Sequence, residues 1–290
     1  MTRCFTRQTS RNKHLSLDTI NLWKFTILAL SLVPERMEIR DTMKSTNKTL
    51  SLEGYSVAVT GASSGLGRAI ALCRAGSYLA KPILIGRREG ELKALKTEIE
   101  RRFGVISDVL VADQCCLAGR EQIASKIEQL SAVAIFLCAG VTSVGPFCED
   151  SDDTYARVIN TNIVSFTDLL ARFIRVFHKL DRDAGILAIS SLAGSTSLPD
   201  QAVYGASKAY IDNLVQALDV ELSYGPISIG TFRPGGIDTP MADKSDLRFG
   251  KLGLMNVDEC AALAVRALVH RKRISIPGWA NTLGHKLISA

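Results

Sequence analysis

The sequence has 290 residues, of which 47% are hydrophobic, and a formal net charge of +6. This apolar content can form a buried core, which excludes a disordered chain, and the length suits one large α/β domain or two small ones. Residues 1–50 hold nine Lys/Arg and four Asp/Glu, so they carry +5 and residues 51–290 carry only +1. A nearly neutral body argues against a surface that binds nucleic acid.

The seven cysteines lie at irregular spacings. An odd number without a pattern does not indicate a disulfide framework. The chain has no Cys-x-x-Cys pair and its four histidines are scattered, so we expect no metal site. These features favour a reducing compartment, and we expect a cytoplasmic protein.

Residues 1–50 differ in character from the rest of the chain, so we divide it into this N-terminal extension and a domain at 51–290. Basic residues precede an apolar run at 25–33, which is shorter than the roughly 20 residues that a membrane span needs. Three interpretations stay open: an extension outside the mature fold, with initiation at Met37 or Met43; a targeting segment; or an interfacial anchor. Membrane contact is expected only through this extension.

From residue 51 onward, short apolar runs alternate with amphipathic stretches of helical length. The apolar runs lie at 56–60, 82–85, 105–111, 133–138, 185–190 and 227–232. The candidate helices lie near 66–76, 89–103, 117–130, 152–180, 203–224 and 256–270. Such alternation is typical of parallel strands joined by helical crossovers. We therefore predict a single α/β domain: a Rossmann-like, doubly wound parallel sheet of about seven strands with helices on both faces.

A glycine-rich turn follows the first strand, with Gly61, Gly65 and Gly67 spaced as Gly-x-x-x-Gly-x-Gly. Glycine lets the backbone approach a ligand closely, and the N-terminus of the next helix offers free N–H groups to a pyrophosphate. A dinucleotide-binding fold needs such a turn at this place. We expect the cofactor to contact Gly61, Ser63, Ser64, Gly65, Leu66 and Gly67.

The loop after the second strand reads Gly86-Arg87-Arg88. In this fold that loop meets the adenosine ribose, where an acid binds a free 2′-hydroxyl and an arginine suits a 2′-phosphate. Arg87 therefore predicts NADP(H) in preference to NAD(H), unless both arginines are solvated surface charges. Asp113 ends the third strand and is a candidate acceptor for the adenine amino group or a cap for the following helix.

Tyr204 and Lys208 stand four positions apart. If the segment is helical, both side chains lie on one face, one turn apart. A lysine this close favours the phenolate, so we expect Tyr204 to exchange a proton nearer to neutral pH than its reference pKa of about 10. By itself, such a pair is a common coincidence in helices.

Together, these motifs resemble those of the classical short-chain dehydrogenase/reductase family over roughly residues 53–278. They are 60–67, Asp113, Cys138-Ala139-Gly140, Asn162, Ser190-Ser191, 204–208 and 233–240. The resemblance implies a hydride transfer between nicotinamide and a small-molecule carbonyl or secondary alcohol. The chain departs from the family where Leu137-Cys138 replaces a pair of asparagines, which puts the rigidity of that loop in doubt.

The resemblance also implies four catalytic residues: Asn162, Ser191, Tyr204 and Lys208. Tyr204 would be the general acid in reduction and the general base in oxidation, and Ser191, which precedes it by 13 positions, would bind the substrate oxygen. Lys208 would lower the pKa of Tyr204 and bind the nicotinamide ribose, while Asn162 would hold a water molecule for proton relay. Ser190 and Asn160 are the competing candidates. The cofactor would further contact Tyr204, Lys208, Ala139, Gly140, Pro234, Gly235, Ile237 and Thr239.

The segment at 241–255 is expected to be a substrate lid, with 141–150 as the opposing wall, around a small to medium carbonyl substrate with an apolar portion. The helices at 162–177 and 204–222 have broad apolar faces, and the resemblance implies a homodimer or homotetramer formed through them. The family often continues beyond the point where this chain stops, so we expect a short or truncated C-terminus. Two alternative functions stay open: a cofactor-binding regulator without turnover, and a dehydratase or epimerase of the same fold.

Overall fold

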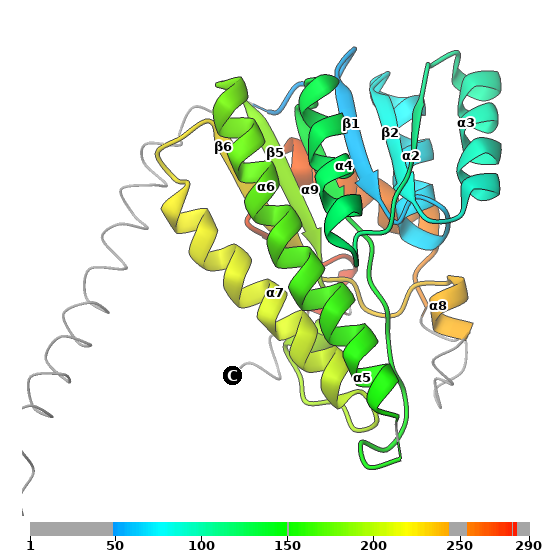
Figure 1. Ribbon diagram of the computed structural model, residues 1–290, viewed down its shortest axis with the longest axis vertical. Helices are drawn as coiled ribbons and strands as arrows, with labels where there is room; N and C mark the ends of the chain where they lie inside the picture. The colour runs from blue at the N-terminus through cyan, green and yellow to red at the C-terminus, as the bar shows by residue number, and fades with distance from the viewer. Residues whose placement is uncertain (1–48, 150, 244–253, 280, 283–290) are drawn as a thin grey trace, which may run out of the picture. The chain divides into compact units, whose positions relative to one another are not determined.

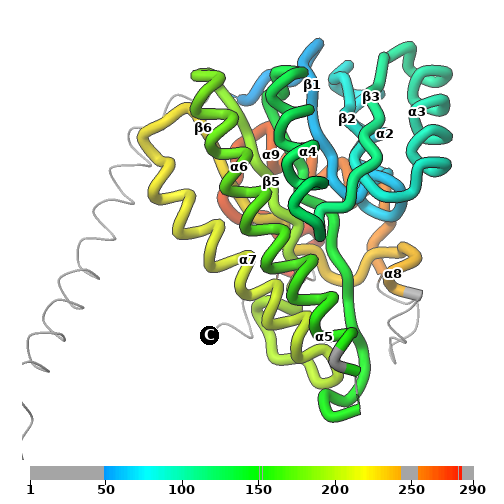
Figure 2. Tube along the Cα trace, viewed as in Figure 1, coloured from blue at the N-terminus to red at the C-terminus, as the bar shows by residue number. Residues whose placement is uncertain are grey.

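The computed structural model shown in Figures 1 and 2 describes residues 49–149, 151–243, 254–279, 281 and 282. They belong to one unit, Thr49–Ala290. The predictions made for the N-terminal extension, for most of the lid and for the C-terminus lie outside the described residues. Within the described ranges, no helix combines the length and the apolar character that crossing a membrane requires.

Seven parallel strands form one sheet in the order β3-β2-β1-β4-β5-β6-β7. The strands are β1 (Ser56–Thr60), β2 (Lys81–Gly86), β3 (Asp108–Val111), β4 (Ala134–Leu137), β5 (Ala184–Ile189), β6 (Ile227–Phe232) and β7 (Ile274–Ser275). The strand order reverses between β1 and β4, which makes the carboxyl ends of these strands the expected ligand crevice. The predicted parallel sheet is confirmed, although β3 begins at Asp108, three residues later than its apolar run, and β7 was not predicted.

Helices cover both faces of this sheet, as predicted. They are α2 (Gly65–Tyr78), α3 (Glu89–Phe103), α4 (Leu117–Gln129), α5 (Asp152–Ile159), α6 (Ser165–Leu180), α7 (Ala202–Glu221), α8 (Pro240–Asp243) and α9 (Val257–Val269), with a π-helical turn η1 (Asn160–Val164) and a 3₁₀ turn η2 (Leu192–Gly194). One core cluster holds residues of α2, α3 and α9, and the other holds residues of α4, α6 and α7 (Figure 1).

The strands separate these two cores because successive side chains point to opposite faces. Val57 and Val59 belong to the cluster beneath α2 and α9, whereas Ala58 belongs to the cluster beneath α4 and α6. All three residues are fully buried. Burial on both faces explains why the strands read as continuous apolar runs.

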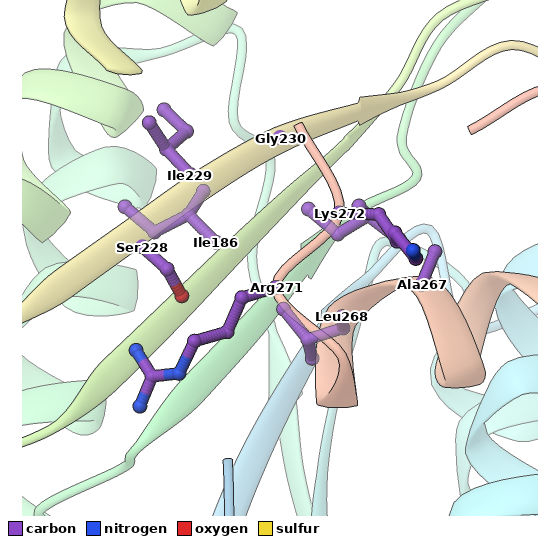
Figure 3. A pocket seen from close by; sticks show the side chains of 9 residues that line it. Ile186, Ser228, Ile229, Gly230, Ala267, Leu268, Arg271 and Lys272 are labelled. Carbon is purple, nitrogen blue, oxygen red and sulfur yellow. The ribbon is translucent and has the colours of Figure 1, made fainter. Parts of the chain in front are cut away.

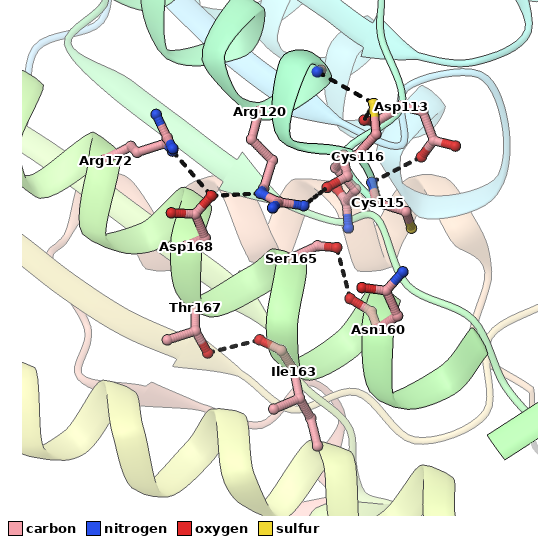
Figure 4. A network of polar contacts seen from close by, with 12 residues as sticks. Asp113, Cys115, Cys116, Arg120, Asn160, Ile163, Ser165, Thr167, Asp168 and Arg172 are labelled. Atoms are coloured by element: carbon pink, nitrogen blue, oxygen red, sulfur yellow. Dashed lines mark hydrogen bonds and ion pairs between the residues drawn. The ribbon is translucent and has the colours of Figure 1, made fainter. Parts of the chain in front are cut away.

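The stretch predicted as one helix at 152–180 contains the π turn η1 between α5 and α6. The backbone N–H of Ser165 donates to the carbonyl oxygen of Asn160, five residues back, and its hydroxyl donates to the same oxygen at 2.6 Å (Figure 4). The hydroxyl of Thr167 donates to the carbonyl oxygen of Ile163 at 2.7 Å. Such single turns often occur at functional sites, and Asn162 lies inside this one.

Candidate active site

The glycine-rich turn packs directly against the first turn of α2. A Cβ atom on Gly67 would lie 2.5 Å from the carbonyl oxygen of Gly61, so a larger residue does not fit there. Gly61 itself has a φ of +68°, which favours glycine. Ser64, the N-cap of α2, makes no capping hydrogen bond with its side chain. The first N–H groups of α2 are therefore available to an anion.

Thr60 joins this turn to the end of β4. Its Oγ1 atom accepts hydrogen bonds from the backbone N–H groups of Cys138 (3.0 Å) and Ala139 (3.1 Å). A Cβ atom on Gly61 would lie only 3.0 Å from Ala139, so the two loops touch. These bonds hold the loop in which the family's asparagines are replaced. Thr60 was part of the recognised motif, but we had not named it as a site residue.

The two arginines after β2 have different partners. Arg87 Nη1 lies 3.7 Å from Asp113 Oδ2, whereas Arg88 donates to the hydroxyl of Ser63 from Nε (3.2 Å) and Nη2 (3.0 Å). Arg88 therefore contacts the glycine-rich turn, although we had singled out Arg87. The second arginine of the Gly86-Arg87-Arg88 sequence could have indicated this contact.

Asp113 is not the cap of α4, because the N-cap is Cys116, whose sulfur accepts from the backbone N–H of Gly119. The Oδ1 atom of Asp113 instead accepts from the backbone N–H of Cys115 at 2.9 Å (Figure 4). This bond closes a turn before α4 and holds the carboxylate near Arg87. The helix-cap alternative was therefore wrong.

The loop after β6, which carries Pro234, Gly235, Ile237 and Thr239, lies over the glycine-rich turn. A Cβ atom on Gly65 would be 3.6 Å from the side chain of Thr239. The backbone N–H of Leu192 donates to the carbonyl oxygen of Pro234 at 3.0 Å, which ties this loop to η2. The structure thus gathers the predicted cofactor residues at one edge of the sheet.

Ser191 follows β5 and is the N-cap of η2, where its Oγ atom accepts from the backbone N–H of Ala193 at 3.1 Å. The turn that it caps packs against α7, since a Cβ atom on Gly205, next to Tyr204, would lie 3.0 Å from the carbonyl oxygen of Ala193. The competing Ser190 is buried, and its hydroxyl donates to the carbonyl oxygen of Lys208 at 3.1 Å. Of the two serines, Ser191 is the one that affects the pKa of Tyr204.

Burial raises the pKa of Tyr204, and the hydrogen bond from Ser191 opposes this shift. Tyr204 as a whole remains partly exposed. The Nζ atom of Lys208 lies 5.6 Å from the ring centre of Tyr204. In these surroundings the desolvation of the phenolate outweighs the attraction to the ammonium, opposite to the direction expected from the sequence.

Lys208 is almost fully buried, and its Nζ atom donates to the carbonyl oxygen of Ile189 at 2.9 Å. Burial lowers the pKa of Lys208 to about 8, against the opposing attraction of Asp212. At neutral pH the side chain is still charged. Its ammonium group therefore sits at the carboxyl end of β5, beside the residues that precede Ser191.

Asn162 is buried in η1 and holds the loop after β4. Its Nδ2 atom donates to the carbonyl oxygen of Val141 (2.8 Å) and to Ser207 Oγ (3.0 Å), and its Oδ1 atom accepts from the N–H of Val141 (3.0 Å). A Cβ atom on Gly140 would lie 3.3 Å from Asn162 Oδ1 and 3.5 Å from Lys208 Nζ. Asn162 and Lys208 therefore meet across Gly140, whereas Asn160 is exposed.

A shallow depression lies elsewhere, between β5, β6 and the end of α9 (Figure 3). It is lined by Ile186, Leu187, Ser228, Ile229, Gly230, Ala267, Leu268, Arg271 and Lys272. None of the predicted site residues lines it. Among the described residues, no group of three or more His, Cys, Asp or Glu is placed to hold a metal ion.

Comparison with known proteins finds relatives of this chain in sequence and in fold. A sequence model of the family described as short chain dehydrogenase matches residues 56–248. A 3-oxoacyl-(acyl-carrier-protein) reductase of Rickettsia prowazekii is 30% identical over 239 residues, which cover 79% of this chain and 95% of the relative. A 7beta-hydroxysteroid dehydrogenase of Collinsella aerofaciens is 28% identical over 182 residues, covering 63% and 68%.

Solved structures share the fold. A 7beta-hydroxysteroid dehydrogenase structure superposes with a TM-score of 0.72 at 26% identity, covering 82% of this chain and 93% of the other. A short-chain dehydrogenase from Sphingobium yanoikuyae has a TM-score of 0.74 at 24% identity, covering 81% and 92%. The second likeness shows the fold alone.

Proposed function

The chain belongs to the short chain dehydrogenase family, and from this premise we propose that it transfers a hydride between NADP(H) and a carbonyl or secondary alcohol, with Tyr204 as general acid and base. Its membership makes it an oxidoreductase that acts on CH–OH or carbonyl groups. The observation that carries the proposal is that the buried ammonium of Lys208 lies 5.6 Å from the ring centre of Tyr204, on a helix that packs against the turn capped by Ser191.

The glycine-rich turn fits a dinucleotide because it presents backbone atoms and no bulky side chains. Gly61 and Gly67 pack too closely to admit side chains, and the N-terminus of α2 lacks a side-chain cap. Thr239 would close this site from the other side, since it lies next to Gly65. When bound, the nicotinamide supplies or accepts the hydride, while the protein orients the reactants.

The preference for NADP(H) rests on Arg87 and Arg88. Both arginines are exposed after β2, and Arg88 already lies within hydrogen-bond distance of Ser63 in the turn. Two cations at this place suit a 2′-phosphate. Fold similarity does not distinguish the cofactors, because the Sphingobium structure is a complex with NADPH and one from Burkholderia phymatum is a complex with NAD.

Cofactor preference can be tested by exchanging these arginines. We expect Arg87→Asp and Arg88→Ala each to weaken NADPH binding about tenfold or more while NADH binding changes little. Arg101→Ala is a matched control, since Arg101 is an exposed arginine in the last turn of α3. Equal loss of both cofactors in the first two variants would contradict the assignment.

In reduction, the hydroxyl of Tyr204 donates its proton to the oxygen of the substrate. Burial raises its pKa, so the hydroxyl carries its proton at neutral pH before the reaction. Ser191 donates a hydrogen bond to the same oxygen, where negative charge develops. The ammonium of Lys208 favours the phenolate that forms, and Asn162 fixes the loop beside it. A water molecule held by Asn162 remains a prediction.

The substrate that we propose is a small to medium carbonyl compound with an apolar portion. Phe147 is 63% exposed in the predicted wall and stacks on Tyr155, with ring centres 5.0 Å apart. The N–H of Gly145 donates to the carbonyl oxygen of Asp200 at 2.8 Å, which joins this wall to the loop before α7. Phe147→Ser should raise KM for ketones with large apolar groups more than for small ketones.

We propose that the protein forms a homodimer or homotetramer through α6 and α7. These helices lie side by side in Figures 1 and 2, and the hydroxyls of Thr167 and Tyr210 are 2.8 Å apart. Val164 (49% exposed) and Tyr210 (37%) leave apolar surface on this face. Tyr210→Glu should yield monomers in sedimentation. A cytoplasmic location remains a prediction.

The central experiment follows NADPH absorbance with a panel of carbonyl substrates. Tyr204→Phe removes the proton donor and should lower kcat/KM by about 10²–10⁴, while NADPH binding, measured by fluorescence, should weaken far less. Full activity in this variant would overturn the acid role. NADPH binding by the natural chain without turnover of any substrate would instead favour a regulator.

A further inference from the structure

A buried ion pair lies one helical turn beyond Lys208. Asp212 follows Lys208 by four positions, as Lys208 follows Tyr204, so all three lie on one face of α7. Asp212 Oδ1 is 3.0 Å from Nε of Arg233, and the two side chains are only 7% and 8% exposed. Neither residue belongs to the catalytic set. Burying such a pair is costly, and it raises the question of what the pair does.

Asp212 lies close to the segments that carry two of the catalytic residues, Ser191 and Lys208. A Cβ atom on Gly194, in the turn that Ser191 caps, would lie 3.0 Å from Asp212 Oδ2. Burial raises the pKa of Asp212, and Arg233 and Ser190 oppose this shift. The hydroxyl of Ser190 donates to the carbonyl oxygen of Lys208. The carboxylate thus stands at the junction of α7, β5 and η2.

Arg233 connects the pair to the cofactor loop. It is buried at the end of β6, directly before Pro234, and its backbone N–H donates to the carbonyl oxygen of Ser275 at 2.8 Å. The next residue, Pro234, accepts the hydrogen bond from Leu192 in η2. Movement of Arg233 would therefore shift both the loop over the glycine-rich turn and the turn that carries Ser191.

The titratable groups that face Lys208 come from two elements. Asp212 and Tyr204 lie on α7, and Cys138 follows β4, while Arg233 faces Asp212. Burial raises the pKa of the Cys138 thiol, so it is neutral at physiological pH. Among the described residues that face Lys208, Asp212 is then the carboxylate that can offset the cost of its buried ammonium.

We propose that Asp212, held by Arg233, is a positioning residue of the active site that keeps Lys208 charged and fixes η2 and the cofactor loop around Tyr204. This inference rests on the proposed function, since it takes Lys208 to assist proton transfer by Tyr204. Without the carboxylate, none of these groups offsets the desolvation of the Lys208 ammonium. Lys208 then loses its proton at lower pH, and the neutral amine no longer stabilises the phenolate of Tyr204.

The first test compares pH profiles of kcat/KM. Asp212→Asn should move the high-pH limit of activity down by roughly one unit. The double variant Asp212→Leu/Arg233→Met removes both charges, so it avoids an unpaired buried cation and should remain folded. It should also shift the limit downward. An NMR titration of isotope-labelled lysine in Asp212→Asn should show the same shift directly at Lys208.

A matched control lies on the same helix. Asp219 is buried two turns after Asp212 and pairs with Arg273 at 2.5 Å, before β7. Asp219→Asn should lower Tm without moving the pH limit. If Asp212→Asn and the double variant keep the natural limit while Tyr204→Phe is inactive, the positioning role is overturned and the proposed function stands. If Tyr204→Phe is fully active, the proposed function fails instead.

Discussion

The Nζ atom of Lys208 donates a 2.9 Å hydrogen bond to the carbonyl oxygen of Ile189, the last residue of β5. Ser191 stands two positions further on, so this bond ties the serine turn to the helix that carries Tyr204. The ammonium is bound to a neutral acceptor inside the protein. Its charge is therefore sensitive to pH in a range where exposed lysines are not.

Because Lys208 is buried, we predict that its side chain affects the stability of the protein in a pH-dependent way. Its pKa falls from 10.5 to about 8 in the fold, so the charged form is disfavoured there relative to the unfolded chain. This cost is fully present below about pH 8 and disappears as pH rises to the unfolded value. Lys208→Met should therefore gain roughly 3 kcal/mol on the natural chain at about pH 7 compared with about pH 10.5. Urea unfolding of the variant and the natural chain at the two pH values measures this gain. If the difference in stability between the two proteins were the same at both pH values, the lowered pKa of Lys208 would be contradicted.

Gly67 tests the packing of the glycine-rich turn. In Gly67→Ala the new Cβ atom would lie 2.5 Å from the carbonyl oxygen of Gly61, which is backbone and cannot swing away. We expect a loss of about 1–3 kcal/mol in stability and weaker binding of either cofactor, measured by denaturant unfolding and fluorescence titration. Gly90→Ala is the control, because no atom lies within 4 Å of its added Cβ, and it should be neutral or stabilising by about 0.4–1 kcal/mol. Similar behaviour of both variants would refute the packing argument.

The fold could be predicted from sequence because its strands are buried on both faces. Val57, Ala58 and Val59 are all fully buried, so the strand reads as an apolar run whichever core each residue faces. The two-residue strand β7 and the four-residue helix α8 are too short to give a periodic signal. The π turn escaped notice because it depends on hydroxyl bonds such as that of Ser165, not on hydrophobic spacing.

The sequence predicted which residues the fold brings together at the candidate site, but not the electrostatics around them. Spacing placed Tyr204 and Lys208 on one helix face, yet the direction of the pKa shift of Tyr204 follows from burial by distant segments. The contact between Arg88 and Ser63 joins residues 25 positions apart. Arg233, the partner of Asp212, does not lie on α7 but follows β6. Tertiary packing decides each of these features, and no local pattern encodes it.

Asn162 and Asn160 offer a paired test of the π turn. Asn162 is buried with three hydrogen bonds, two of them to Val141, whereas Asn160 is exposed. Asn162→Ala leaves the N–H of Val141 without this acceptor and should cost about 2–3 kcal/mol in stability, together with a lower kcat. Asn160→Ala should change stability by less than about 0.5 kcal/mol. The idea that Asn162 holds the loop would be lost if both variants unfolded at the same denaturant concentration.

Arg74 in α2 leads to the opposite expectation, a gain in stability. Its side chain is fully buried, and none of its three guanidinium nitrogens has a hydrogen-bond partner among the described residues. The rings of Tyr78 and Phe136 lie 5.4 and 5.3 Å from its Cζ atom and offset part of the desolvation cost. A buried charge without an acceptor usually costs more than such contacts return.

Arg74→Met should therefore raise the free energy of unfolding by about 1–3 kcal/mol, because methionine fills a similar volume without a charge. Arg102→Met is the control: Arg102 also stacks on a ring, that of Phe103, but it is exposed and paired with Glu98, so its change should stay within about 0.5 kcal/mol. Denaturant midpoints with unchanged m-values would measure both effects. A clear loss of stability in Arg74→Met would show that the two aromatic rings outweigh the desolvation of the guanidinium.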